Sequence, residues 1–467
     1  MHLEFHMESA PTAISGHIVA MPYPGRGHIN PLMNLCKLLV SKNNDLHVTF
    51  VVTEEWLGFI GSEPKPDNIR FSTIPNVIPS ELGRGKDFVA FFDAVMTKME
   101  APFQQLLDRL ELLPTMIIHD TFLFWVVGEG NRRNIPVASF FTMSASIFSF
   151  LHHFHLFNQN GHYPVNLLEK GDERVDYIPG LSSTRLADFP LLDGNCISQH
   201  LLQWFQKGFS AVQKAQYLLF PSIYELESQV IEALKAKLLL PIYTIAPVIP
   251  YFSLGDTPSL SINDYCYLKW LDNQPSASVL YISHGSFVSV SSAQMDEIAA
   301  GLRESGVRFL WVARGEASRL KGICGDMGLV LEWCDQLRVL LHPAIGGFCS
   351  HCGWNSTREG VFAGAPFLTF PILMDQPLNS KLIVEDWKIG WRVKRELGMD
   401  TLVRREDIAV LLHKFMDLDS DSVREMRKRA RELQQVYQLA LAIGGSSETN
   451  INAFVKDIIE SANKYTY

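Results

Sequence analysis

The hydrophobic residues of this chain gather in short runs that alternate with segments of helix length. The runs are continuous instead of alternating with polar residues, which is typical of strands buried on both faces of a parallel sheet. The intervening segments repeat apolar residues at helical spacing, as in PLMNLCKLLVSKN after the first run. The strands predicted in the first half are residues 17–23, 47–53, 69–75, 116–120, 137–142, 216–222 and 243–247.

This alternation stops near Pro247 and then starts again. Residues 248–264, rich in Pro, Ser, Gly and Asp, predict a linker. We therefore predict an α/β protein of two doubly wound, Rossmann-like domains that face each other across a cleft, residues 1–250 and 251–467, with the last helix packing back on the first domain. The strands predicted in the second half are residues 278–286, 308–314, 328–333, 345–351, 366–371 and 390–394.

Composition supports a folded protein with two cores and excludes some partners. The 467 residues are 47% hydrophobic and 19% charged, which fits two domains of ordinary size. A net charge of −9 argues against nucleic acid or an anionic membrane as a partner. The most hydrophobic window, residues 139–157, holds three His and five Ser or Thr, so we expect no membrane span.

Cysteine usage and the N-terminus bear on the compartment. The seven cysteines are odd in number and scattered, which argues against a disulfide framework. Cys349 and Cys352 have C-x-x-C spacing, but no second pair lies nearby to complete a metal site. The first sixteen residues lack the basic start and apolar run of a secretory signal. We expect a cytoplasmic protein.

The segment PGRGHINP, residues 24–31, follows the first predicted strand and opens the first helix. Its two glycines allow a tight turn, and His28 then lies at a helix start that faces the cleft. A neutral imidazole in such a place can take a proton from a hydroxyl near neutral pH. The alternative is a histidine that caps its own helix or hydrogen-bonds the loop.

Asp120 ends the predicted strand 116–120. A carboxylate beside an imidazole fixes its tautomer and stabilises the imidazolium that forms during proton transfer. His28 and Asp120 therefore suggest a catalytic pair. The alternative for Asp120 is an N-cap of the helix that follows.

The segment SHCGWNSTREG, residues 350–360, follows a predicted strand in the second half. The first amides of the helix after Gly353 form an anion site, to which His351 can add a donor, and a diphosphate fits it. An alternative for Ser356 and Glu359 is a capping box. A capping box does not explain Trp354 or Asn355.

Two further strand ends carry side chains suited to parts of one ligand. Trp333 offers an indole on which a planar base can stack, or else it is a core residue at a strand end. Asp375 and Gln376 suit neighbouring hydroxyls of a sugar, with an Asp N-cap as the alternative. Together these segments suggest a base, a ribose, a diphosphate and a sugar, that is, a nucleotide-sugar.

These motifs resemble a known family. The 44 residues from Trp333 to Gln376 resemble the signature box of plant secondary-product glycosyltransferases, which are UDP-dependent family-1 enzymes of the GT-B fold. The likeness extends to residues 24–31, to Asp120 and Trp125, and to residues 267–286. Three segments, WVARGE, EWCDQLRVL and LTFPILMDQ, are most similar to sequences of the group-87 branch.

The resemblance implies a role for each matching residue. His28 would be the base and Asp120 its partner. Residues 1–250 would bind the acceptor and residues 251–467 the UDP-sugar. The implied donor contacts are Trp333, Cys334 (through its backbone) and Gln336 with uridine; Glu359 with the ribose; Ser286, His351, Asn355 and Ser356 with the diphosphate; and Thr142, Trp354, Asp375 and Gln376 with the sugar.

The resemblance also implies the reaction. Gln376 favours UDP-glucose, and attack opposite the leaving UDP inverts the anomeric carbon to give a β-glucoside. The acceptor would be a small lipophilic alcohol or phenol, such as a flavonoid, terpenoid or hormone, in a pocket lined by residues 120–126 and 139–157. Helix amides and His351 would stabilise the leaving diphosphate, so no metal or other cofactor is expected. The enzyme would act as a monomer.

Two other classes of function are possible from the residues. A protein that binds nucleotide-sugars without turnover would not need His28 and Asp120. A dinucleotide oxidoreductase would use two Rossmann-like halves, but PGRGHINP is not G-x-G-x-x-G.

Overall fold

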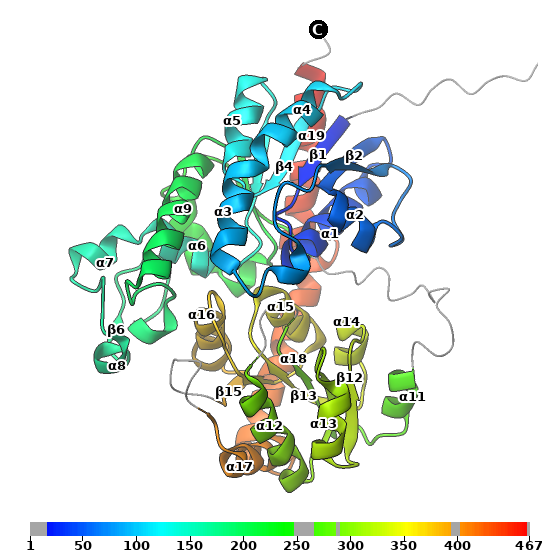
Figure 1. The fold of residues 1–467 in the computed structure, drawn as a ribbon, viewed down its shortest axis with the longest axis vertical. Helices are drawn as coiled ribbons and strands as arrows, with labels where there is room; N and C mark the ends of the chain where they lie inside the picture. Colours follow the sequence, from blue (N-terminus) through cyan, green and yellow to red (C-terminus); the bar gives the residue numbers. More distant parts are fainter. Residues whose placement is uncertain (1–15, 247–265, 286–289, 394–401, 465–467) are drawn as a thin grey trace, which may run out of the picture.

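The computed structural model describes residues 16–246, 266–285, 290–393 and 402–464. Two parallel sheets, each flanked by helices, form an N-terminal half (residues 16–246) and a C-terminal half (residues 266–441) (Figure 1). All seven strands predicted in the first half and all six predicted in the second are present, with ends that differ by a few residues. The predicted linker, with the domain boundary after residue 250, lies outside the described residues.

The sheet of the N-terminal half has the strand order β3-β2-β1-β4-β5-β8-β9, and every pairing is parallel. From β1 the chain proceeds to one side of the sheet and from β4 to the other, so their carboxyl ends flank the switch point where ligands of such sheets bind. The strands are β1 (Gly16–Met21), β2 (Leu46–Thr53), β3 (Ile69–Ile74), β4 (Met116–Asp120), β5 (Val137–Phe140), β8 (Tyr217–Phe220) and β9 (Ile242–Thr244).

The sheet of the C-terminal half repeats this arrangement, with the order β12-β11-β10-β13-β14-β15 and parallel pairing throughout. Its switch point lies between β10 and β13. The strands are β10 (Val279–Ser283), β11 (Arg308–Val312), β12 (Gly328–Leu331), β13 (Ile345–Ser350), β14 (Phe367–Thr369) and β15 (Gly390–Arg392).

Each sheet is buried on both faces, which explains the continuous apolar runs. In β1, Ile18 and Ala20 face one core while Val19 and Met21 face another, and all four are fully buried. Helices therefore cover both faces. In the N-terminal half they are α1 (Arg26–Lys42), α2 (Glu54–Ile60), α3 (Phe88–Lys98), α4 (Glu100–Asp108), α5 (Trp125–Arg132), α6 (Ala145–His152), α7 (His155–Gln159), α8 (Leu167–Lys170), α9 (Cys196–Val212) and α10 (Ser228–Lys235).

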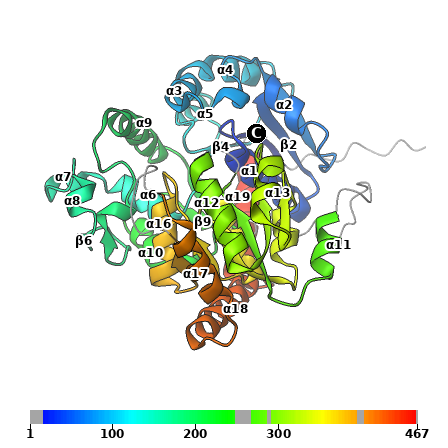
Figure 2. The same cartoon turned by 60° about the horizontal axis from the view of Figure 1, so that its bottom comes forward.

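The helices of the C-terminal half cover its sheet in the same way. In both views α12 and α17 lie side by side on one face (Figures 1 and 2), and α18 packs against α15 on the other. The helices are α11 (Cys266–Asp272), α12 (Ser292–Ser305), α13 (Ala317–Cys324), α14 (Gln336–Leu340), α15 (Trp354–Ala363), α16 (Gln376–Lys381), α17 (Arg405–Met416) and α18 (Asp421–Leu441), with a π-helical turn η6 (Leu382–Asp386) after α16.

The last helix, α19 (Ser446–Lys464), lies against the N-terminal half. Ile451, Phe454 and Ile458 are buried in the core formed by β1, β2 and α1. Tyr243 of β9 donates a hydrogen bond to Asp457 at 2.7 Å. The chain therefore returns to its first domain. Among the described helices, none combines the length and the hydropathy needed to cross a bilayer.

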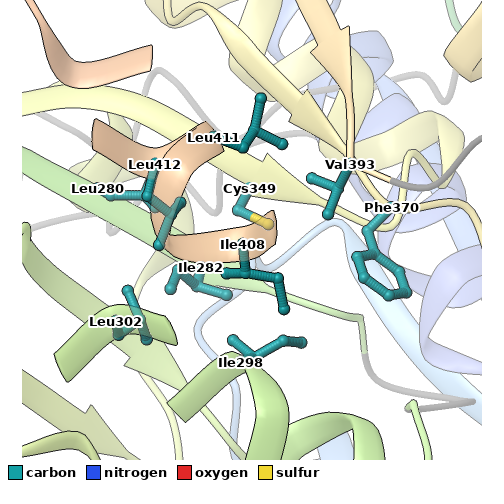
Figure 3. Close-up of a pocket in the computed structure, with 10 residues that line it drawn as sticks. All are labelled: Leu280, Ile282, Ile298, Leu302, Cys349, Phe370, Val393, Ile408, Leu411 and Leu412. Atoms are coloured by element: carbon teal, nitrogen blue, oxygen red, sulfur yellow. The ribbon is translucent and has the colours of Figure 1, made fainter. Parts of the chain in front are cut away.

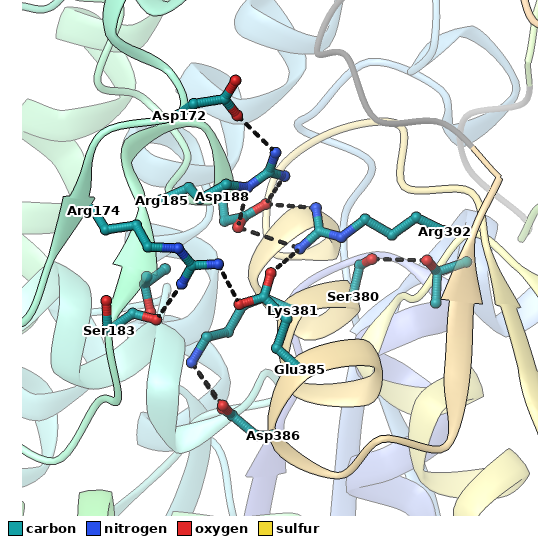
Figure 4. A network of polar contacts seen from close by, with 12 residues as sticks. Asp172, Arg174, Ser183, Arg185, Asp188, Ser380, Lys381, Glu385, Asp386 and Arg392 are labelled. Carbon is teal, nitrogen blue, oxygen red and sulfur yellow. Dashed lines mark hydrogen bonds and ion pairs between the residues drawn. The ribbon is translucent and has the colours of Figure 1, made fainter. Parts of the chain in front are cut away.

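A short antiparallel hairpin, β6 (Arg174–Val175) and β7 (Thr184–Arg185), was not predicted. It links the halves through ion pairs (Figure 4). Arg174 meets Glu385 at 2.7 Å, and the buried Asp188 accepts from Arg185 and Arg392, both at 2.8 Å. The pairing is short and polar, so it carries no hydrophobic period that sequence analysis could detect.

The core of the C-terminal half contains a small cavity of about 20 Å³ between the sheet, α12 and α17 (Figure 3). A space of this size could hold one water, but an apolar lining offers no hydrogen bonds and stays dry. It is therefore a packing defect of the core. Its lining residues are Leu280, Ile282, Ile298, Leu302, Cys349, Phe370, Val393, Ile408, Leu411 and Leu412.

Candidate active site

His28 lies in the first turn of α1, directly after β1. Its ring Nδ1 lies 2.7 Å from Oδ2 of Asp120, the last residue of β4. Because β1 and β4 are neighbours in a parallel sheet, the two side chains meet although 92 residues separate them. Asp120 is 1% exposed, so water screens its carboxylate only weakly.

The Asp120 carboxylate orients its own loop as well as His28. Its Oδ1 accepts from the amide of Phe122 at 3.0 Å. Helix α5 starts only at Trp125, and its N-cap is Phe124, which makes no side-chain cap. The alternative of Asp120 as an N-cap of the helix is therefore wrong, since the chain turns once before the helix begins.

Thr142 completes the surroundings of His28. Its hydroxyl lies 2.9 Å from Nδ1 of His28 and 3.5 Å from Oδ2 of Asp120. We predicted a sugar contact for Thr142, and the structure places its hydroxyl beside the imidazole. With Nδ1–H directed at Asp120 and Thr142, the lone pair of the neutral ring lies on Nε2. His28 can thus accept a proton at Nε2.

An aromatic cluster adjoins the His28 ring. Tyr23 and Phe122 lie 4.9 and 5.9 Å away between ring centroids. Phe122 in turn contacts Phe205 at 5.3 Å and Phe92 at 6.5 Å. All four rings are buried, so the side of His28 that faces this cluster has apolar surroundings.

The segment 350–360 forms the end of β13 and the start of α15. The N-cap of α15 is Gly353, which has no side chain to occupy the first amides. Ser356 and Glu359 lie inside the helix, so the capping-box alternative is wrong: the helix begins three residues earlier than that interpretation requires. The helix N-terminus is therefore suited to an anion.

His351 lies between two glycine turns beside this helix start. A Cβ added to Gly285 or Gly353 would lie 2.6 Å from Nε2 of His351, so neither position tolerates a side chain without movement. Gly285 also has a φ of +86°, which favours glycine. Burial lowers the pKa of His351 to about 4, so the ring is a neutral donor. Ser286, which was also predicted to hold the diphosphate, lies outside the described residues.

Three polar side chains of the predicted donor site bind one another. Gln336, the first residue of α14, donates to Ser356 Oγ at 3.0 Å and to Glu359 Oε2 at 2.6 Å. Its Oε1 accepts from the hydroxyl of Tyr281 at 3.1 Å. Burial raises the pKa of Glu359, and Gln336 opposes that shift.

Trp333 and Cys334 flank this network between β12 and α14. The indole of Trp333 is 59% exposed, so the alternative of a core residue is wrong. Cys334 is buried, with its sulfur 3.5 Å from the Tyr281 hydroxyl. An exposed indole beside a polar network can stack on a planar base.

Trp354 is placed differently from the other residues of its motif. Its indole is 3% exposed, donates to the carbonyl of Pro221 at 3.3 Å and packs 6.4 Å from the Trp387 ring. The side chain is thus committed to the contact between the two halves. The predicted sugar contact would therefore fall to the main chain of Trp354, whose amide hydrogen-bonds to the Asp375 carboxylate.

Asp375 and Gln376 stand at the start of α16. Burial raises the pKa of Asp375 to about 6, while Asn379 and the charge of His28 act in the opposite direction. Asp375 is the N-cap residue of α16, as the alternative predicted, but its side chain makes no cap hydrogen bond. Its Oδ2 instead accepts from Asn379 at 2.7 Å. Gln376 Oε1 accepts from the amides of Ile372 and Leu373.

The two halves meet at the site itself. Asn355 of α15 donates to the carbonyl of Gly27 at 2.9 Å, one residue before His28. Ser144 of the N-terminal half donates to Asn379 at 3.1 Å. The helix start proposed for an anion and the imidazole proposed as a base therefore lie on the same side of the molecule.

Sequence analysis missed three features of this site. It did not find Thr142 beside His28, the Gly27 carbonyl as a partner of Asn355, or Arg358, whose guanidinium donates to Asn355 at 2.6 Å. Only the spacing of Asn355 and Arg358, three apart on one helix, could have indicated a contact.

Comparison with known proteins gives a consistent result. The family model described as UDP-glucoronosyl and UDP-glucosyl transferase matches residues 69–404. The chain is 54% identical to UDP-glycosyltransferase 87A1 of Arabidopsis thaliana, over 94% of this chain and 99% of that protein. It is 53% identical to UDP-glycosyltransferase 87A2 of the same plant, over 95% and 96%.

Solved structures of plant enzymes share the fold. Medicago truncatula UGT71G1 complexed with UDP-glucose is similar with a TM-score of 0.78 and 27% identity, over 95% of this chain and 98% of that one. Phytolacca americana UGT2 complexed with UDP-2fluoro-glucose and pterostilbene is similar with a TM-score of 0.78 and 25% identity, over 95% and 99%.

Proposed function

Since the chain belongs to the UDP-glucoronosyl and UDP-glucosyl transferase family, in plant group 87, and is a glycosyltransferase of the GT-B fold, we propose that it transfers glucose from UDP-glucose to a hydroxyl of a small lipophilic acceptor. The transfer inverts the anomeric carbon and gives a β-glucoside. Membership of this family rules out the oxidoreductase and the binding protein without turnover.

The observation that carries this proposal is the contact between the halves at His28. The neutral imidazole, held at Nδ1 by Asp120 and Thr142, takes the proton of the acceptor hydroxyl at Nε2 as that oxygen attacks C1 of the sugar. Asp120 stabilises the imidazolium that forms. The link from Asn355 to Gly27 at 2.9 Å sets the base against the helix that holds the donor.

UDP leaves from the face of C1 opposite the attacking oxygen, and negative charge grows on its diphosphate. The uncapped amides of α15, with Ser286, His351, Asn355 and Ser356, stabilise that charge. We propose that these donors make a divalent metal unnecessary. Chelation with EDTA should leave the rate unchanged, and a loss that Mg²⁺ restores would contradict this part.

The donor is held by the groups already gathered in the C-terminal half. Trp333 stacks on uracil, the Cys334 backbone and Gln336 bind its edge, and Glu359 accepts from the ribose hydroxyls. Asp375, Gln376 and the main chain of Trp354 contact the sugar. The Gln376 amide lies at the start of α16, where it favours glucose.

The acceptor lies in the N-terminal half, against the aromatic cluster beside His28. Rings such as Tyr23, Phe92, Phe122 and Phe205 suit a flat, apolar molecule with one reactive hydroxyl, such as a flavonoid, a terpenoid or a hormone. Apolar walls discriminate weakly between molecules of similar size, so several acceptors should be accepted.

We also propose that the enzyme acts as a cytoplasmic monomer. All seven cysteines are free, which is typical of proteins from a reducing compartment. Sedimentation of the purified protein at micromolar concentration tests the oligomeric state, and a stable dimer would contradict it.

The deciding experiment measures UDP release with UDP-glucose, UDP-galactose and UDP-glucuronic acid, each with a phenolic and a terpenoid alcohol. UDP-glucose should react fastest, and proton NMR of the product should show a β-linked sugar. A faster reaction with another donor would overturn the donor assignment, and an α-linked product would overturn inversion.

A further inference from the structure

The inner face of α15 carries a buried arginine. Arg358 is 2% exposed and is among the largest fully buried side chains of the described residues. A buried cation is costly unless other groups satisfy it. Among the described residues no carboxylate pairs with Arg358 at ion-pair distance. Apart from the Tyr437 hydroxyl, which lies close to the guanidinium, its Nε and Nη1 have no hydrogen-bond partner there. Packing alone gives no reason for a charge in this place.

One strong contact of Arg358 is well defined. Nη2 donates to Oδ1 of Asn355 at 2.6 Å, one helical turn toward the N-terminus of α15. The nearby carboxylate, Glu359, is already bound by Gln336, and the Tyr437 hydroxyl of α18 lies near the guanidinium. The guanidinium is therefore directed at the Asn355 amide.

This contact decides which way the Asn355 amide is turned. A guanidinium has donors only, so the amide oxygen must face Arg358 and the amide nitrogen must face away. On that side Nδ2 donates to the Gly27 carbonyl at 2.9 Å. The second N–H of the same nitrogen remains for a ligand at the start of α15. Turned the other way, the amide would present an oxygen to Gly27 and to the ligand.

We propose that Arg358 is a positioning residue of the donor site, which locks the Asn355 amide with its NH₂ group toward both Gly27 and the diphosphate of the donor. One buried cation thus serves two functions, because the same amide links the halves and binds the leaving group. This inference rests on the proposed placement of the diphosphate at the N-terminus of α15.

The test compares UDP binding by calorimetry in Arg358→Met, Arg358→Lys, Asn355→Ala and the double variant Arg358→Met with Asn355→Ala. Arg358→Met should weaken UDP binding about tenfold and raise the donor KM without raising the acceptor KM, because a charged hydrogen bond to the amide is lost. Arg358→Lys keeps a donor at this place and should restore most of the affinity. In the Asn355→Ala background, Arg358→Met should change UDP affinity less than about twofold.

Thermal unfolding separates this role from a purely structural one. Replacing a buried charge with an apolar side chain of similar length is often neutral or stabilising, so Arg358→Met should not lower the Tm. Arg427→Met is the matched control: Arg427 of α18 also has buried nitrogens without a partner among the described residues, and it makes no hydrogen bond to Asn355 there. The Arg427→Met variant should leave UDP affinity unchanged.

Each outcome decides one point. Wild-type UDP affinity in Arg358→Met, or losses that add with those of Asn355→Ala, would overturn the inference. If Arg358→Met does not fold, Arg358→Leu is measured in its place. The inference is also overturned if Arg358→Lys folds but binds UDP as weakly as Asn355→Ala does. A wild-type protein that does not bind UDP would instead overturn the proposed donor site. UDP lacks the sugar, so errors about glucose or the acceptor do not affect this test.

Discussion

The proposed catalytic pair of the N-terminal half and the proposed donor site of the C-terminal half differ in how far their side chains are already arranged for the reaction. His28, Asp120 and Thr142 are already within hydrogen-bond distance of each other. In the donor site, by contrast, the polar side chains bind one another or their own loops, as Gln336 binds Glu359 and Gln376 binds Ile372.

This difference suggests a division of labour. A preorganised base needs no rearrangement at the moment of reaction. The side chains of the proposed donor site must give up internal hydrogen bonds to bind the nucleotide. Their net contribution to the binding free energy is therefore the difference between the hydrogen bonds gained and those lost. Changes in the N-terminal half should therefore act on kcat, and changes in the C-terminal half on the affinity for UDP.

The substitution expected to have the largest effect, and to separate the two halves most clearly, is His28→Ala. Loss of the base should lower kcat on the order of 10³-fold, while UDP affinity stays at the wild-type value because no proposed nucleotide contact is removed. Initial rates at saturating UDP-glucose and calorimetry with UDP measure the two quantities. An equal loss in both would show that His28 supports the donor site and is not the base.

Asp120→Asn should have the next largest effect, a fall in kcat of about 100-fold. The amide still fills the space but no longer stabilises the imidazolium or fixes the tautomer. Thr142→Val is the control, because it leaves the Asp120 carboxylate intact, and it should keep more activity than Asp120→Asn. If Thr142→Val were the less active variant, the proposed pairing of His28 with Asp120 would be contradicted.

Glu359→Gln tests the donor side. Losing a charged acceptor for the ribose hydroxyls should weaken UDP binding on the order of 30-fold, with kcat at saturating donor nearly unchanged. The deoxyribose analogue of UDP sharpens the test: wild type should bind it less tightly than UDP, and Glu359→Gln should hardly distinguish the two. Equal discrimination in both proteins would show that Glu359 does not touch the ribose.

The smallest expected effect is a pH dependence that belongs to Asp375. Burial raises the pKa of Asp375 to about 6, so its carboxylate, the proposed acceptor for sugar hydroxyls, predominates above pH 6 and is lost as the pH falls. From pH 7 to pH 5, affinity for UDP-glucose should fall relative to UDP by at most about tenfold. Asp375→Asn should remove this trend, and a trend that persists would assign it to another group.

The sequence predicted the strands of both sheets well, but it did not decide between alternative roles for single residues. The strands predicted to end at residues 120, 333 and 351 end at 120, 331 and 350 in the structure. The agreement is close because a continuous apolar run in a doubly wound fold forms a strand that is buried on both faces. The capping box at Ser356 and Glu359 was wrong because α15 begins at Trp354. A helix start depends on where the preceding strand leaves its sheet, which spacing along the chain does not fix.

By itself the sequence determined the fold, the order of the motifs and the family. Those properties follow from hydrophobic period, glycine turns and local residue chemistry, each of which acts over a few residues. Only the tertiary structure decided which atoms meet: Asn355 with Gly27 across 328 residues, Trp354 with Pro221 across 133, and Thr142 with His28 across 114. Such contacts depend on how two independently formed sheets approach and on which rotamers fit between them, and neither leaves a pattern along the chain.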